Sequence, residues 1–254
     1  MAANARGWPV WLTSLSLLVS SAALPVGTRA ADEPRPPLDF VPPEPGTYRL
    51  HRIMPAPDGQ VLTVDGRPTP LSQFTRERIT LLGFIYTTCI DPQGCALAYQ
   101  VFHRLRDEVQ ATPAVAGKVQ FVTLSFDPAR DSPAVMKHYA GSQLEEERGV
   151  RWYFLTTRSV EDLLPLVEGF GQDVRYAVDR STGKPVRQLS HVLKVFLIDW
   201  SGYVREIYTS TFLHPQTIMG DIQTLLMEGG DPDPPPSIIH GGDPESDSGS
   251  FRTP

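Results

Sequence analysis

The stretch "YTTCIDPQGCALAY" contains both cysteines of the chain, Cys89 and Cys95, separated by the five residues "IDPQG". Two thiols this close can form a structural disulfide, act as a redox pair or bind a soft metal ion. A disulfide closing so short a ring would add only about 2 kcal/mol of stability. A thioredoxin-like redox motif has two residues between its cysteines, so this longer loop gives no specific reason to expect that redox behaviour.

The cysteine loop lies between a predicted strand and a predicted helix. "ITLLGFIYTT" (79–88) is a continuous apolar run typical of a buried strand. "CALAYQVFHRLRDEVQ" (95–110) has the spacing of an amphipathic helix, with a buried face formed by Leu97, Val101, Leu105 and Val109. The loop therefore follows the carboxyl end of a central strand, where α/β folds usually place their chemistry.

The helix position of Cys95 predicts a lowered thiol pKa, because a helix N-terminus stabilises an anion. Asp91 lies inside the loop and would oppose a thiolate unless a cation were bound. The pair Asp91 and Pro92 is equally typical of a turn.

The rest of the chain alternates between predicted strands and helices. We expect a β-hairpin from 48–54 and 61–66, strands at 118–126, 151–157, 191–199 and 202–209, and helices at 132–142, 159–171 and 214–228. Ser132 and Pro133 fit the N-cap and first position of the second helix. The expected fold is therefore α/β and thioredoxin-like, a mixed central sheet flanked by helices with an added N-terminal β-hairpin.

The two ends of the chain differ in composition from the predicted domain at 47–228. Residues 1–30 carry Arg6, an apolar run and small residues near Ala30, as expected for a signal peptide or an N-terminal anchor. A Pro-rich linker (31–46) follows, and the acidic, Pro/Gly-rich tail (229–254) is expected to be disordered. This organisation predicts an extracytoplasmic (periplasmic) protein, secreted or membrane-anchored through its N-terminus.

The charge of the chain argues against a nucleic-acid partner. Its formal net charge is −6, and removal of residues 1–30 takes away Arg6 and Arg29 but no acidic residue, which leaves −8. Nucleic-acid-binding domains usually carry the opposite sign. A cationic or metal partner is compatible with this charge but does not follow from it.

Four segments, in order, resemble the Sco/SenC family of thioredoxin-fold copper proteins over about residues 45–228. They are "LLGFIYTTCIDPQGCALA", "VQFVTLSFDPARDSPAVMKHYA", "WYFLTTRSVEDLLPLVEGFG" and "SHVLKVFLIDWSGYV". The family has a C-P-D-x-C-P pattern. Here the loop is two residues longer, and Ile90 and Ala96 replace the prolines.

The resemblance implies that Cys89, Cys95 and His191 are ligands of one copper ion, Cu(I) or Cu(II). His191 is expected to begin the strand at 191–199 and to return beside the cysteine loop. Two thiolates suit Cu(I) and an imidazole can hold either state, although zinc uses the same donors. Asp127 resembles an acidic residue near the family's metal loop and is equally a turn residue before Pro128. Asp131 is expected to cap a helix.

The resemblance implies a metallochaperone that serves a copper site, most directly CuA of cytochrome c oxidase. Its partners would be a copper-receiving oxidase subunit and a thiol reductant that keeps Cys89 and Cys95 reduced. The main alternative is an extracytoplasmic thiol-disulfide oxidoreductase that uses the same pair. A peroxide-reducing relative on this fold and a binding module with a plain structural disulfide are two further alternatives.

Overall fold

The computed structural model describes residues 38, 40–145, 149–172, 174–178 and 185–229, with the backbone alone at 174–178 and 185–191. The predicted signal or anchor segment, half of the linker and almost all of the tail lie outside these residues. None of the described helices is long and apolar enough to cross a bilayer.

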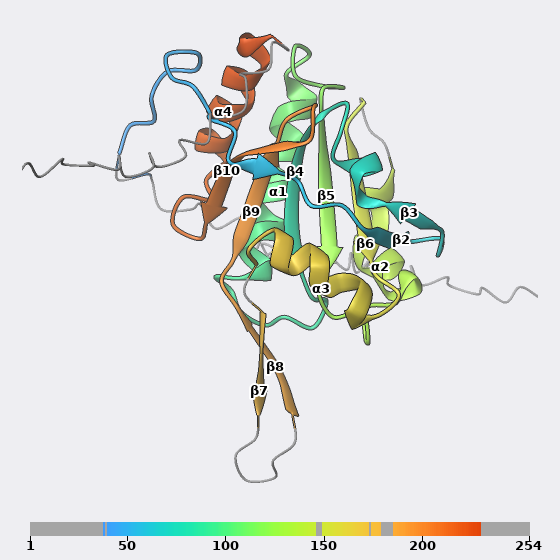
Figure 1. Ribbon diagram of the computed structural model, residues 1–254. Coiled ribbons are helices and arrows are strands. Elements are labelled where there is room, and N and C mark those ends of the chain that lie inside the picture. The colour runs from blue at the N-terminus through green and yellow to red at the C-terminus, as the bar shows by residue number, and fades with distance from the viewer. Residues whose placement is uncertain (1–37, 39, 146–148, 173, 179–184, 230–254) are drawn as a thin grey trace, which may run out of the picture. The chain divides into compact units, whose positions relative to one another are not determined.

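A mixed sheet of eight strands forms the centre of the domain (Figure 1). In spatial order the strands are β1 (Met54–Pro55), β10 (Tyr203–Thr209), β9 (Lys194–Ile198), β4 (Ile79–Ile85), β5 (Val119–Ser125), β6 (Arg151–Thr156), β2 (Gln60–Thr63) and β3 (Pro68–Pro70). Strands β4, β5 and β6 are parallel, whereas β9 is antiparallel to both β4 and β10. The predicted mixed α/β fold is confirmed.

Helices cover both faces of this sheet. They are α1 (Cys95–Ala111), α2 (Pro133–Ala140), α3 (Val160–Gly169) and α4 (Pro215–Glu228), with short 3-10 turns at Leu71–Phe74 and Gly141–Leu144. Buried side chains of α1, α2 and α4 belong to one core cluster, and those of α3 belong to a second cluster on the other face. The predicted N-cap is confirmed, since the Ser132 side chain accepts a hydrogen bond from the Val135 N–H.

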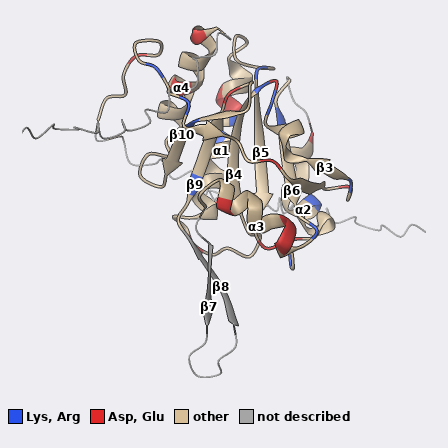
Figure 2. Ribbon diagram, viewed as in Figure 1, with Lys and Arg blue, Asp and Glu red and all other residues tan. Residues whose placement is uncertain are grey.

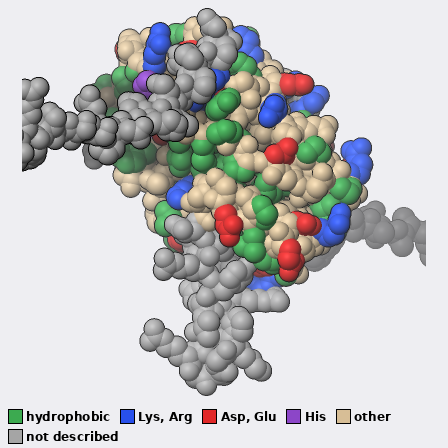
Figure 3. All heavy atoms as spheres, in the orientation of Figure 1, with side chains coloured by type: hydrophobic (Ala, Val, Ile, Leu, Met, Phe, Trp, Pro, Cys, Tyr) green, Lys and Arg blue, Asp and Glu red, His purple; other side chains and the backbone are tan. Residues whose placement is uncertain are grey.

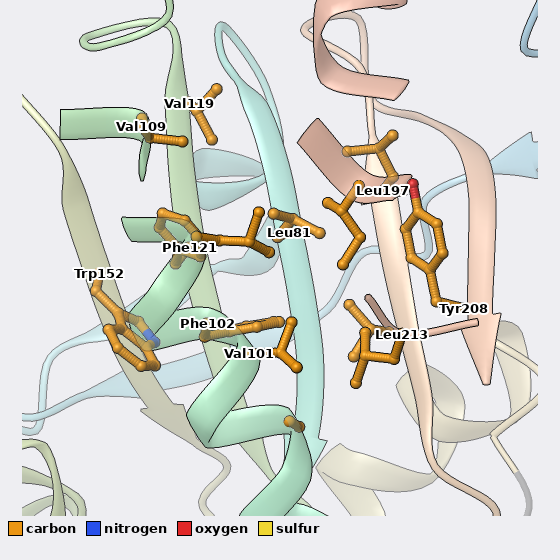
Figure 4. Packing of buried hydrophobic residues seen from close by; sticks show 14 of the residues in the cluster. Leu81, Val101, Phe102, Val109, Val119, Phe121, Trp152, Leu197, Tyr208 and Leu213 are labelled. Carbon is orange, nitrogen blue, oxygen red and sulfur yellow. The ribbon is translucent and has the colours of Figure 1, made fainter. Parts of the chain in front are cut away.

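The two central strands are buried along their whole length, as their continuous apolar runs predict. Figure 4 shows Leu81 of β4 and Phe121 of β5 packed against Val101 and Phe102 of α1, with Trp152 of β6 beside them. The predicted apolar face of α1 is buried at all four positions. The cysteine loop therefore follows a rigid strand and leads into a helix fixed by core packing.

A second, two-stranded sheet was not predicted from the sequence. Strands β7 (Val174–Val178) and β8 (Pro185–His191) form a hairpin between α3 and β9, in which Val174 is paired with His191. The prediction that His191 begins the fourth long strand is therefore wrong. It is the last residue of β8, and β9 begins only at Lys194.

The predicted pairing of 48–54 with 61–66 is also wrong. Met54 is the one residue of the first segment that lies in a strand, β1, which pairs with β10, while β2 pairs with β3 in a hairpin and with β6. An N-terminal hairpin is therefore present but is built from Gln60–Thr63 and Pro68–Pro70. The first segment finds its partner in a strand far along the chain, and local sequence carries no signal for that pairing.

Charged side chains are spread over the described surface. Figure 2 shows basic and acidic residues interspersed along the strands, helices and loops. On the face shown in Figure 3, apolar side chains lie in small groups between charged and polar ones. Exposed large apolar residues include Ile90, beside Cys89, and Val192, beside His191.

Candidate metal centre

The cysteine loop is a turn that leads directly into α1. Strand β4 ends at Ile85, and α1 begins at Cys95, with Gly94 as its N-cap. Asp91 shapes the turn, because its Oδ1 accepts from the Gln93 N–H (2.9 Å) and its carbonyl accepts from the Gly94 N–H (3.2 Å). The turn interpretation of Asp91 is thereby confirmed.

The structure brings the two predicted cysteine ligands together. Their side chains lie within hydrogen-bond contact of each other and are not joined by a disulfide in the described part of the chain. Cys95 is only 3% exposed and belongs to the core under α1, while Cys89 is half-buried. The hydroxyl of Tyr86 makes a hydrogen bond with Cys89. The loop thus presents one accessible and one enclosed thiol.

The prediction of a lowered pKa at Cys95 is wrong for the metal-free protein. Burial raises the pKa of the Cys95 thiol, and the neighbouring Cys89 raises it further. Hydrogen bonds from the backbone N–H groups of Tyr86 and Cys95 lower this pKa by less than burial raises it. Burial and Cys89 also raise the pKa of Tyr86, to about 12. Desolvation raises the Cys95 pKa by more than the helix N-terminus lowers it, so a bound cation would be needed to hold both cysteines as thiolates.

We expect a thiol alkylating agent at neutral pH to modify Cys89 at least about tenfold faster than Cys95, because each unit of raised pKa cuts the thiolate fraction about tenfold. Mass spectrometry of peptides from reduced protein, sampled over time, gives the two rates. The same reaction in denaturant is the control and should make the rates similar. Equal rates in the folded protein would contradict the burial of Cys95.

Asp131 anchors the start of the loop and does not cap a helix as predicted. It is 1% exposed, and its carboxyl oxygens accept from the Thr87 N–H (3.0 Å), the Thr87 hydroxyl (2.5 Å) and the Ser125 hydroxyl (2.5 Å). The N-cap is the next residue, Ser132. Asp131 therefore ties β5 to the residue two positions before Cys89.

Asp127 is connected to the cysteine loop by a neighbouring arginine, Arg130. Its carboxylate is 3.9 Å from the Arg130 guanidinium, which donates a 3.4 Å hydrogen bond to the Thr88 hydroxyl. Asp127 also accepts backbone hydrogen bonds from the Arg130 and Asp131 N–H groups, as a turn residue does. Its turn role is thus visible, and a role near the metal stays a prediction.

The backbone of His191 runs to the same end of the sheet as the cysteine loop. Strand β9 is antiparallel to β4, and Val195 is paired with Gly83. The residues before Lys194 must therefore pass the carboxyl end of β4, from which the loop departs. The imidazole itself lies outside the described side chains. Among the side chains that are described, no three His, Cys, Asp or Glu residues form a metal-binding group.

A family model supplies the deciding comparison. The model described as SCO1/SenC matches residues 60–227, which is more than half of the chain. The chain belongs to the SCO1/SenC family. Among curated proteins there is no significant match.

Solved SCO1/SenC structures share the fold. The apo Sco1 protein of Thermus thermophilus is 25% identical, with a TM-score of 0.54, and the alignment covers 71% of this chain and 95% of that one. A SCO1/SenC lipoprotein of Bacillus anthracis is 23% identical (TM-score 0.55; 68% and 95% covered). ScoI of Arabidopsis thaliana, solved with copper bound, is 16% identical (TM-score 0.54; 67% and 97% covered). The thioredoxin-like fold of this SCO1/SenC protein is thereby confirmed.

In the loop region of this SCO1/SenC protein, sequence reasoning missed Tyr86 and gave Asp131 the wrong role. Tyr86 follows the buried strand β4, and an aromatic residue with a polar end at that place could have been singled out. The anchoring role of Asp131 had no such signal, because its partner Thr87 is 44 positions away. Only folding brings Asp131 and Thr87 together.

Proposed function

We propose that this SCO1/SenC protein carries one copper ion and takes part in assembly of a copper site, most directly CuA of cytochrome c oxidase. The observation that carries the proposal is the contact between the thiols of Cys89 and Cys95 at the carboxyl end of the central strand. Family membership supports it, since this is the role that the resemblance implies.

The donor set fits copper. Two thiolates prefer Cu(I), and His191 would supply a third donor able to hold Cu(I) or Cu(II). Cys89 is half-buried, and Ile90 beside it is 95% exposed, so an incoming ligand from a recipient protein can approach this side of the loop. A carrier needs such an approach, because its cargo must leave as well as bind.

We further propose that the protein acts in an extracytoplasmic space with two partners. Residues 1–30 would export the protein or anchor it, residues 31–46 would link this segment to the domain at 47–228, and residues 229–254 would form a tail. The domain would then meet an oxidase subunit that receives copper in an extracytoplasmic space. A thiol reductant would also be required there, since that space favours disulfides.

The test is anaerobic titration of the reduced full chain with Cu(I) against a competing chelator. We expect one tightly bound ion in the wild type and weaker binding in Cys89→Ala, Cys95→Ala and His191→Ala. His138→Ala, on the exposed side of α2, is the control and should bind like the wild type. Binding no tighter than in the cysteine variants would contradict the proposal.

Oxidation should switch the carrier off. A disulfide between Cys89 and Cys95 cannot offer two thiolates, so we expect fully oxidised protein to take up little Cu(I). The same titration after removal of the oxidant, with thiols counted before and after, measures this. Uptake of one equivalent by fully oxidised protein would show that the thiols are not the ligands.

A second candidate function is thiol-disulfide exchange, which the contact between the two thiols also favours. The accessible Cys89 would attack a substrate disulfide and Cys95 would resolve the mixed disulfide, so that the protein pair is oxidised as the substrate is reduced. This function predicts that His191→Ala keeps full exchange activity. The copper titration and an exchange assay on that variant separate the two functions.

A further inference from the structure

Residues 171–172 and 192–194, the two chain segments that flank the β7–β8 hairpin, form what we call the neck of the hairpin. A buried side-chain amide joins them. The Gln172 Nε2 donates a 2.7 Å hydrogen bond to the carbonyl of Val192 and so joins the two chain segments on either side of the hairpin. Lys194 adds a second tie, from its Nζ to the carbonyl of Gly171 (2.5 Å). Gln172 is itself fixed to α3, since its N–H donates to the carbonyl of Val167 (2.9 Å).

The side-chain amide of Gln172 lowers the stability of the fold at this position. Gln172 is 3% exposed, and its Oε1 is buried with no hydrogen-bond partner among the residues that the structure describes. An unpaired buried acceptor is destabilising, and a methionine of similar size would fill the space without that cost. The structural gain from the amide is the bond to Val192, which sets the position of the neck.

The position of the neck matters because of the residue next to it. Val192 directly follows His191, whose backbone is paired with Val174 at the base of the hairpin. The bond to the Val192 carbonyl therefore fixes the chain one peptide unit away from the proposed imidazole ligand. Leu193, which is 5% exposed, anchors the following position in the core.

We propose that Gln172 is a positioning residue for copper, which fixes the His191 segment relative to the cysteine loop through its bond to Val192. The inference rests on the proposed copper function and deepens it. Residues that orient a metal ligand typically change metal affinity about 10-fold to 100-fold when they are replaced. The effect should fall on Cu(II), which depends on the imidazole, more than on Cu(I), which two thiolates can hold.

The experiment compares Gln172→Met with wild type in the reduced full chain under anaerobic conditions. Cu(I) and Cu(II) affinities are measured by chelator competition, and the Cu(II) site is recorded by EPR. Lys194→Met removes the other tie of the same neck. Gln120→Met is the matched control: Gln120 is equally buried and donates to the Phe74 carbonyl (2.9 Å), but it lies at the start of β5, away from the cysteine loop. Each variant is also made in a His191→Ala background.

We expect Gln172→Met to weaken Cu(II) binding about 10-fold or more and to change its EPR spectrum, with a smaller change from Lys194→Met and none from Gln120→Met. In the His191→Ala background, Gln172→Met should have no further effect on copper. An unchanged Cu(II) site, or an equal loss in that background, would overturn the role of Gln172 while leaving the copper function standing. Wild type that binds no copper would overturn both. If Gln172→Met fails to fold, Lys194→Met decides by the same comparisons.

Discussion

Replacement of Asp131 by alanine should destabilise the protein by about 3 kcal/mol or more and weaken Cu(I) binding at the same time. The substitution strands three donors, the buried Ser125 hydroxyl and the N–H and hydroxyl of the half-buried Thr87. Each buried group that loses its partner costs about 1–3 kcal/mol. Since Thr87 begins the approach to Cys89, its release should also loosen the loop. Urea unfolding and the Cu(I) titration measure the two effects.

A surface carboxylate provides the control for Asp131. Asp65 pairs with Lys137 at 3.1 Å, but both side chains are more than half exposed. Asp65→Ala should therefore cost no more than about 1 kcal/mol and leave copper binding unchanged. Asp131→Asn, which keeps one acceptor oxygen, should fall between the two. If Asp131→Ala lost no more stability than Asp65→Ala, the anchoring role would be wrong.

Replacement of Arg205 by methionine should destabilise the protein by about 3–5 kcal/mol and leave copper affinity unchanged. The guanidinium is 5% exposed and contacts Asp199 at 3.0 Å and Glu228 at 2.6 Å. It also donates to the Leu50 carbonyl from Nε (2.8 Å). Without it, the Asp199 carboxylate, whose side chain is 2% exposed, stays buried without its counter-charge.

Arg205 should contribute to stability but not to copper binding, because of where its partner Asp199 lies. Asp199 follows the last residue of β9, Ile198, which is paired with Thr80 near the start of β4. This cluster therefore lies at the opposite end of the strand from the cysteine loop. The double variant Arg205→Met with Asp199→Asn should recover part of the lost stability, because it removes the stranded charge. Unchanged stability in Arg205→Met, or copper binding lost by the folded variant, would contradict this assignment.

Much of the fold could be predicted because local pattern and tertiary structure agree. The apolar runs of β4 and β5 are buried throughout, and the Ser132 and Pro133 pair begins α2. The errors concern pairings that local sequence does not encode. The two-residue strand β1, Met54–Pro55, pairs with β10, which lies about 150 positions later in the chain. Strands β7 and β8 pair with each other in a separate two-stranded sheet, and their sequences contain no continuous apolar run that would have indicated a strand.

The candidate site could be predicted in its residue types but not in its electrostatics. The spacing of strand and helix places Cys95 at the start of α1, as observed. Whether the pKa of the Cys95 thiol is raised or lowered depends on how deeply the thiol is buried in the core. The sequence of the loop does not indicate that depth. The anchoring of Thr87 by Asp131 likewise depends on two loops that meet only when β4 and β5 pair.

The two ends of the described domain leave it at one place. The Gly46 N–H donates to the Thr224 hydroxyl (3.0 Å), and the Leu50 N–H donates to the Glu228 carboxylate (3.3 Å), so the entering segment is fastened to the last turns of α4. This seam adjoins Arg205, at the end of the sheet away from Cys89. The cysteine loop therefore lies at the opposite end of the central sheet from the place where the described chain enters and leaves the domain.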